Sequence, residues 1–545
     1  MSENRAKKQN IWVKVGIEVA IYATVFLLAI FAYWTVKPLI AVQSRGFVAQ
    51  VIMGLAILLC LGFVAYMGAT KRLTTRTIIL VLMIIGLIMR LGYVLYTPAT
   101  YRQHDTFSKN FDGHEAYAWT IFSTGKLPTT NKYQFYHPPL NALLQAGFMK
   151  FSSALANLFS LGGDFFTKFS YGKPDYVDAE RYFLYSTCQI LGVMYSVVTM
   201  VAMVKIVGMF AFSDKAKLFA VAIVVLYPRN IHMAGMLNND GVAYMAAILA
   251  LYFALKWWKQ GKKLQWILPC GVSIGLGMMA KLSSATVCMP IAGIFIYEFI
   301  LTLRKKEGAL PFWKMAVQYG AFLCVCAPIG LWFQVYAKQR FGQDFGYVWN
   351  NLTDRLYTGD KSWFARFVFP FDASEFFGRV YCYSFDNYYL FNFALRSSIF
   401  GEQSYTQGTV FAALSVFMAY IAAIALATAL VWCIVAYVRK CKNKNAVLLG
   451  EQKPTVSFAD FLFVFLLLQS QVISEIYFYI SMPYGCTMDF RYIMPMILSL
   501  GLTVGCVHKT LAAEGGKASL VINRVLLIAV AAFLACSTLF YLTCA

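Results

Sequence analysis

The sequence predicts an all-α polytopic membrane protein with about thirteen transmembrane helices. Of its 545 residues, 60% are hydrophobic and only 13% are charged, whereas soluble proteins carry roughly 25% charged residues. Apolar runs of about 20 residues, the length that crosses a bilayer, recur along the whole chain. They lie at 11–35, 50–69, 76–96, 183–211, 217–236, 241–258, 265–281, 284–303, 313–337, 407–437, 457–480, 491–507 and 521–545.

The basic residues predict which loops share a side of the membrane. The chain begins with the basic sequence MSENRAKKQN, and its first apolar run is too long for a signal peptide, so we expect a retained anchor and a cytoplasmic N-terminus. Thirteen crossings put every short basic loop on that side, which fits the positive-inside rule. These loops lie at 70–76, 213–217, 256–263, 303–308, 439–445 and 508–517. The net charge of +22 therefore requires no nucleic-acid partner.

The same topology leaves two long outer loops, 97–182 and 338–406. Loops of this length usually carry function, and their many aromatic residues suit the membrane interface. Cys382 and Cys486 both fall on this side, where they could form a disulfide that sequence alone cannot establish.

A short surface helix is predicted in the first outer loop by DGHEAYAWTIFSTG, residues 112–125. Asp112 fits its N-cap, Glu115 completes a capping box, and Gly125 fits its C-terminal stop. An amphipathic helix of this kind would lie on the membrane surface. Both acids thus have a structural explanation beside a functional one.

Asp105 lacks such an explanation, because no helix follows closely enough for it to cap. Next to His104 in YRQHD, it is a candidate general base, and the alternative is a solvated loop carboxylate. His104 and His114 are candidate binding residues beside these acids. His137, before two prolines, fits either a structural hydrogen bond or a substrate contact.

Polar residues also gather at the outer ends of predicted crossings. In LNND, Asn239 or Asp240 fits a helix cap, which leaves a binding role open for the other. Lys281 and Arg491 fit snorkelling or, for Arg491, pairing with Asp489. Alternatively, both cations converge on an anion such as a phosphate.

Seven segments together resemble a known family. In order they are YRQHD, GHEAYAWTIFSTGKLP, FYHPPL, LNND, GLGMMAKLS, SSIFGE and FRYIMP, spread over about residues 76–510. The pattern is similar to bacterial GT-C glycosyltransferases related to family 39, which include protein O-mannosyltransferases and lipid A aminoarabinose transferases.

The resemblance implies a GT-C fold with interfacial helices in the first long outer loop. It implies a polyprenyl-phosphate sugar donor and an inverting transfer, with the base at Asp105 or, as second candidate, Asp112. Many relatives have an adjacent Asp-Glu pair that this chain lacks, which leaves the base and a divalent metal ion open. The expected division is 1–75 with two additional helices, 76–337 with the catalytic core, 338–406 as second loop and 407–545 with the last helices.

The sequence therefore predicts a membrane glycosyltransferase acting on the outer face of a bacterial plasma membrane. Lys281 and Arg491 would hold the donor phosphate, and the acceptor would be a hydroxyl of a lipid, glycan or protein. The predicted donor and acceptor site also includes His104, His114, Glu115, His137, Asn239 and Asp240, of which His104 and His114 would orient the sugar or the acceptor. No residue is assigned to a metal. The alternatives are a multi-pass transporter, for which Glu475 is the clearest intramembrane acid, and a non-catalytic protein that binds lipid-linked glycans.

Overall fold

The computed structural model describes residues 2–39, 45–348, 354–368, 379–385, 387–442 and 456–544. Over these residues the chain is helical, and its β-contact is an isolated bridge between Tyr357 and Tyr484. Eleven helices in this part of the chain are long and apolar enough to cross a membrane. The predicted all-α polytopic fold is confirmed.

Each of the thirteen predicted crossings has a helical counterpart. Eleven are full spans formed by α1 (Ser2–Leu39), α2 (Arg45–Ala69), α3 (Thr75–Tyr96), α7 with α8 (Ala179–Thr187 and Gln189–Val207), α11 (Asp240–Lys259), η3 with α13 (Leu282–Val287 and Cys288–Leu303), α14 (Phe312–Phe341), α18 (Thr409–Lys442), α20 (Phe458–Ser481), α21 (Met496–Glu514) and α22 (Lys517–Thr543).

The remaining two crossings depart from a full straight span. A bend of 41° separates α9 (Asp214–Leu226) from the segment formed by α10 (Pro228–His232) and η2 (Met233–Gly235). The bend falls where Pro228 begins α10, since proline cannot donate a backbone hydrogen bond. The other, α12 (Leu264–Ala280), has 17 residues.

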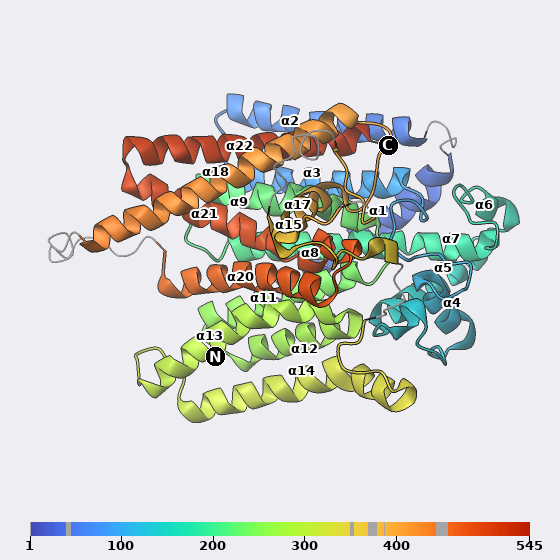
Figure 1. Ribbon diagram of the computed structural model, residues 1–545, viewed down its shortest axis with the longest axis horizontal. Coiled ribbons are helices and arrows are strands. Elements are labelled where there is room, and N and C mark those ends of the chain that lie inside the picture. Colours follow the sequence, from blue (N-terminus) through green and yellow to red (C-terminus); the bar gives the residue numbers. More distant parts are fainter. Residues whose placement is uncertain are drawn as a thin grey trace.

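The two long loops fold into short helices. The first contains α4 (His114–Thr124), η1 (Tyr133–Tyr136), α5 (Leu140–Leu158) and α6 (Gly163–Thr167), and the described part of the second contains η4 (Asp354–Leu356), α15 (Trp363–Phe367) and α17 (Leu390–Phe400). Figure 1 shows α4, α5 and α6 together at one end of the long helices.

The two loops also contact each other. Gln343 Nε2 in the second donates a hydrogen bond to the carbonyl of Tyr136 in the first, at 3.2 Å. We call the end of the bundle at which they lie the loop end.

Two buried basic side chains join helices near the loop end. Lys37 of α1 donates hydrogen bonds to the carbonyls of Val94 and Thr97, at 3.0 and 3.1 Å. Arg90 of α3, fully buried, donates to the carbonyl of Val225 at 3.0 Å. Carbonyl acceptors compensate the cost of burying these charges, so both cations are explained by packing.

The disulfide that the sequence left open is absent. Cys382 and Cys486 are both free thiols, and the Cys382 thiol donates a weak hydrogen bond to the carbonyl of Gly401 at 3.4 Å. No covalent link therefore joins the segments that carry these two cysteines.

Candidate functional site

A cavity of about 420 Å³ lies at the loop end, between the two long loops and the ends of α11, α12 and α20. Seven of the ten residues predicted for the site line it: Asp105, His114, His137, Asn239, Asp240, Lys281 and Arg491. Segments far apart in the sequence thus supply one cavity, which we call the outer cavity.

Lys281 and Arg491 enter the outer cavity from different elements. Lys281 follows the last residue of α12, and Arg491 lies in η6 (Phe490–Ile493). Both contact the ring of Tyr492, with Lys281 Nζ 4.5 Å and Arg491 Cζ 5.0 Å from its centre. The two cations therefore share one wall, as expected for groups that converge on an anion.

Asp240 pairs with Lys281 and so fixes its position. Asp240 is the first residue of α11, and its carboxylate accepts from the Lys281 ammonium and, at 2.8 Å, from Asn238 Nδ2. Burial lowers the pKa of Lys281, while Asp240 acts in the opposite direction. Because the pair is largely buried, its charges attract more strongly than they would in water.

The prediction that the side chain of Asn239 or Asp240 caps α11 is wrong. Asn239 occupies the N-cap position, but its side chain forms no cap hydrogen bond and instead donates to the carbonyl of Ala280 at 3.0 Å. The residue after Ala280 is Lys281, so Asn239 ties the start of α11 to the backbone beside that cation.

Asp105 lies on the exposed side of the outer cavity. Its Oδ1 accepts a hydrogen bond from the Tyr133 hydroxyl at 2.6 Å, and its carbonyl accepts from the His114 amide at 3.0 Å. Its φ of 52° is in the left-handed region, which aspartate tolerates better than most residues. An unusual backbone held by neighbours on both sides fits a carboxylate that is fixed for function.

Two histidines line the cavity next to Asp105. The rings of His114 and His137 stack with their centres 5.7 Å apart. Burial lowers the pKa of His114 to about 4 and holds that of His137 well below its usual range. Both imidazoles are therefore neutral near pH 7, and each can donate one hydrogen bond and accept another.

The predicted capping box of α4 is wrong. Gly113 occupies its N-cap without a side-chain cap, and Asp112 Oδ1 instead accepts from the Ser108 hydroxyl at 2.6 Å. Glu115 is drawn away by Arg181, whose Nη2 donates to it at 2.8 Å. Neither acid lines the outer cavity. The predicted stop at Gly125 is confirmed by its left-handed conformation.

An ion pair behind the cavity was not predicted from the sequence. Arg229 Nη2 donates to both carboxylate oxygens of Asp489, at 2.9 and 3.0 Å, and both side chains are fully buried. Asp489 Oδ1 also accepts from the Arg491 amide at 2.9 Å. Arg491 Nε is farther from Asp489, at 3.8 Å. Asp489 therefore orients the backbone of Arg491 and pairs chiefly with Arg229.

A signal for Arg229 was present in the sequence, since it is a basic residue inside the predicted crossing 217–236. Its guanidinium also lies against Gly401, where an added Cβ would be 2.0 Å from Arg229 Nη1. Gly401 has a φ of 66°, so both its conformation and this close approach require glycine.

His104 lies beside this ion pair and does not line the outer cavity. Its Nε2 is 3.5 Å from Asp489 Oδ2, and its Nδ1 is 3.8 Å from Glu402 Oε2. Burial lowers the pKa of His104 well below its usual range and, with Asp489 nearby, raises that of Glu402.

His104, Glu402 and Asp489 have the composition of a metal site, with ligand atoms within 4.8 Å of one another. They do not fit a divalent cation, however. Both Asp489 oxygens already accept from Arg229, whose fixed positive charge would repel the ion. The metal that the sequence left open thus gains no support from this group.

Comparison with known proteins gives one match. The family model for dolichyl-phosphate-mannose-protein mannosyltransferase matches residues 187–332, which include Asn239, Asp240 and Lys281 but not Asp105 or Arg491. No curated protein matches the chain. The match covers less than half of the chain and supports a membrane glycosyltransferase of the mannosyltransferase type.

Proposed function

We propose that this protein transfers a sugar from a polyprenyl-phosphate donor to an acceptor hydroxyl, with Asp105 as the general base. The observation that carries the proposal is that Asp105 lines the same cavity as Lys281 and Arg491. A carboxylate and two cations around one space suit a reaction in which a hydroxyl attacks while a phosphate leaves.

The two cations would hold the donor phosphate. The guanidinium of Arg491 offers paired N–H donors in a fixed plane, and the ammonium of Lys281 offers a compact charge. When the bond from the anomeric carbon to the phosphate oxygen breaks, the electron pair stays on the phosphate, and fixed cations stabilise that added charge. Asp240 and Asp489 keep the cations in position before the substrate binds.

Asp105 would activate the acceptor. A hydroxyl is a weak nucleophile, and a carboxylate oxygen within about 2.6–3.2 Å removes its proton as its oxygen bonds to the anomeric carbon. Attack from the side opposite the phosphate inverts that carbon. His114 and His137, both neutral, would hold sugar or acceptor hydroxyls through hydrogen bonds.

The positions of the loops support one side of the membrane for the reaction. The loop end carries both long loops, and the short basic loops would lie at the opposite, cytoplasmic end. We therefore propose that the reaction takes place on the outer face of a bacterial plasma membrane. The acceptor hydroxyl belongs to a lipid, a glycan or a protein.

The test uses the purified full-length protein in lipid vesicles with radiolabelled polyprenyl-phosphate mannose and an extract of membrane acceptors. We expect sugar transfer in the wild type and a loss on the order of 100-fold or more in Asp105→Asn, because the general base is removed. Asp164→Asn, an exposed acid in the same loop, is the matched control and keeps full activity.

Two outcomes would contradict the assignment. Full activity in Asp105→Asn together with loss in Asp112→Asn would transfer the role of base to Asp112. A wild-type protein that consumes no polyprenyl-phosphate sugar would refute the donor class, and it would favour the transporter alternative.

A further inference from the structure

The wall formed by α20 and η6 has a cavity on each of its faces. One face lines the outer cavity through Ser474, Tyr477, Phe478, Arg491 and Tyr492. The other lines a second cavity through Leu468, Val472, Glu475, Phe490 and Ile493. Helical spacing separates the two sets on α20, because residues three and four apart share a face.

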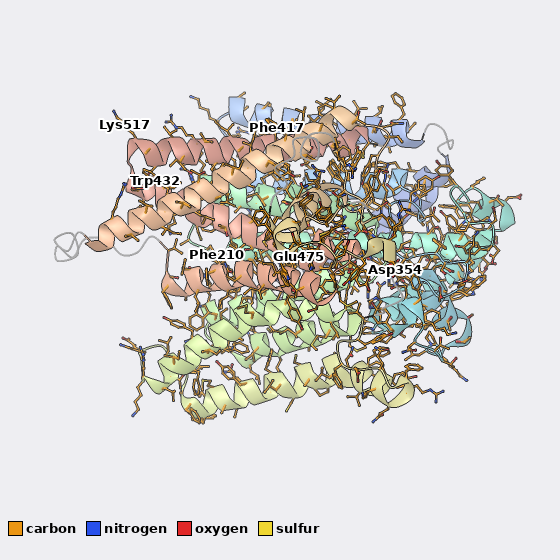
Figure 2. All side chains as sticks on the ribbon, viewed as in Figure 1. Phe210, Asp354, Phe417, Trp432, Glu475 and Lys517 are labelled. Atoms are coloured by element: carbon orange, nitrogen blue, oxygen red, sulfur yellow. The ribbon has the colours of Figure 1, made fainter. Side chains whose placement is uncertain are left out.

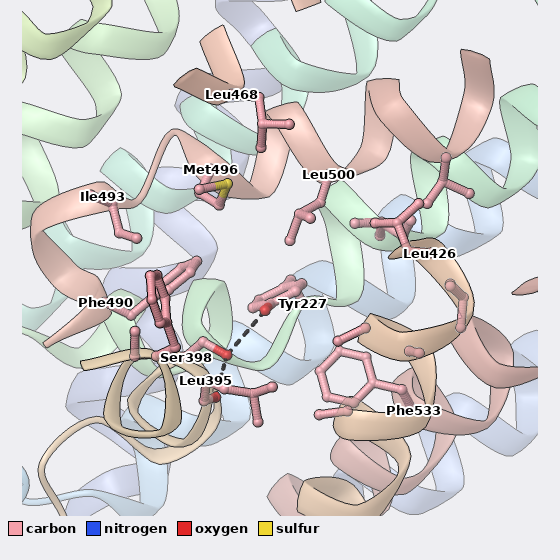
Figure 3. Close-up of a pocket in the computed structure, with 18 of the residues that line it drawn as sticks. Tyr227, Leu395, Ser398, Leu426, Leu468, Phe490, Ile493, Met496, Leu500 and Phe533 are labelled. Carbon is pink, nitrogen blue, oxygen red and sulfur yellow. Dashed lines mark hydrogen bonds between the residues drawn. The ribbon is translucent and has the colours of Figure 1, made fainter. Parts of the chain in front are cut away.

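The second cavity has a volume of about 600 Å³ and lies among α9, α17, α18, α20, α21 and α22. Figure 3 shows the apolar side chains that surround it. One wall is a row of alanines on α18, at 419, 422, 423 and 427, whose small side chains leave the space open. Ala423 and Ala427 are exposed, so the cavity is accessible on its α18 side. We call it the alanine cavity.

Two of the polar side chains that line the alanine cavity are already bonded. The Tyr227 hydroxyl contacts Ser398 Oγ at 3.0 Å, and Ser398 Oγ donates to the carbonyl of Leu395 at 2.6 Å. Figure 3 shows this chain of hydrogen bonds. The hydroxyl protons of Tyr227 and Ser398 are therefore already donated within the protein.

Glu475 is different. It is only 4% exposed, and neither of its carboxylate oxygens has a hydrogen-bond partner. Figure 2 labels Glu475 near the middle of the view. An unpaired acid in apolar surroundings within a membrane is costly, and such residues usually mark a functional site.

Glu475 lies near the loop end of its helix, and the apolar walls extend deeper. It precedes the last residue of α20, Ser481, by six residues, or roughly 9 Å at 1.5 Å per residue. From Ala419 to Ala427 the wall on α18 continues inward for roughly 12 Å. The cavity therefore has its acid near one end and an apolar channel leading away from it.

We propose that the alanine cavity binds a bilayer lipid whose hydrocarbon chain fills the channel and whose ammonium head group donates hydrogen bonds to Glu475. An alanine-lined space that is open within membrane-spanning helices suits a hydrocarbon chain. A carboxylate without a partner suits a head group that brings both positive charge and N–H donors, as phosphatidylethanolamine does. The proposal goes beyond the transfer reaction and does not depend on it, because its readout is lipid binding.

The test compares two lipids that differ in donor capacity. The purified full-length protein is loaded with dioleoyl phosphatidylethanolamine or dioleoyl phosphatidylcholine, and retained lipid is counted by native mass spectrometry. Both head groups carry the same charges, but choline has no N–H donor. We expect roughly tenfold greater retention of the ethanolamine lipid, which is the size expected for a charge-assisted hydrogen bond.

Variants locate the bound lipid. We expect Glu475→Leu to abolish the preference for ethanolamine, and Ala423→Leu with Ala427→Leu to reduce retention of both lipids. Ala413→Leu, at an exposed α18 position outside the cavity, is the matched control. Glu475→Leu should fold, because it removes an unpaired acid from an apolar wall, and an unchanged or higher melting temperature checks this.

Three results with the two lipids would overturn the proposal. They are equal retention of the two lipids by the wild type, an ethanolamine preference that persists in Glu475→Leu, and retention unaffected by the leucines at 423 and 427. Displacement of the retained lipid by polyprenyl phosphate would also overturn it, because that result would assign the cavity to the donor's own chain.

Discussion

The outer cavity and the alanine cavity share the wall made by α20 and η6, but they differ in whether their charged side chains have partners. In the outer cavity the cations are held by partners, Lys281 by Asp240 and the backbone of Arg491 by Asp489. In the alanine cavity Glu475 has no partner. Charges that are fixed in advance suit a reaction whose transition state they must meet without rearrangement. A charge without a partner suits a site that its ligand completes.

The largest effect is expected at the ion pair behind the outer cavity, where a single substitution should lower the stability of the protein. Arg229→Gln or Asp489→Asn removes the partner that the other buried charge contacts most closely, which costs about 3–5 kcal/mol of stability. We expect a large fall in the denaturation midpoint of either single variant. The double variant Arg229→Leu/Asp489→Leu should recover much of that loss, since neither charge then remains. Single variants as stable as the wild type would show that the pair does not support the site.

The next largest effect is expected at the two cations of the outer cavity, Lys281 and Arg491. Lys281→Ala and Arg491→Ala should each lower transfer from polyprenyl-phosphate mannose on the order of 100-fold, because each removes a fixed charge from the leaving phosphate. Lys150→Ala, an exposed lysine on α5, is the control for loss of a positive charge in this region. Loss in Lys281→Ala alone would mean that Arg491 serves the fold and not the phosphate.

The pH dependence of stability tests the prediction that the buried His114 is neutral. The folded-state pKa of His114, about 4, is below its unfolded value of 6.5, so the unfolded chain binds more protons between these values. The stabilisation from neutral His114 is complete above about pH 6.5 and is lost as pH falls towards 4, by up to about 3 kcal/mol. Melting temperatures across this range should fall less in His114→Gln. The same pH dependence in the variant would assign the effect to another group.

The smallest effect is expected on the other face of the wall. Glu475→Gln should change transfer less than about twofold, because Glu475 does not line the outer cavity. Assays at saturating donor, beside Asp105→Asn as the inactive reference, make this measurement. A loss comparable to that of Asp105→Asn would show that the two cavities act together.

The helices could be predicted from the sequence because hydropathy is a local property. Every predicted crossing coincides with a helix, since any run of about 20 apolar residues must satisfy its own backbone hydrogen bonds within a membrane. The departures are at Pro228, which bends one crossing, and in α12, which is shorter than the others. Cavity-lining residues such as Asp105, Lys281 and Arg491 were also identifiable, as polar groups at helix ends or in long loops.

The hydrogen-bond and ion-pair partners of these side chains could not be predicted in the same way. Asp112 and Glu115 matched a capping box in sequence, but Arg181, far along the chain, takes Glu115 into an ion pair. Asp489 was a plausible partner for Arg491, yet Arg229 holds it from another helix. Ion pairs and stacked rings depend on which segments are brought together, so the sequence decided the helices and the tertiary structure decided how their charges are used.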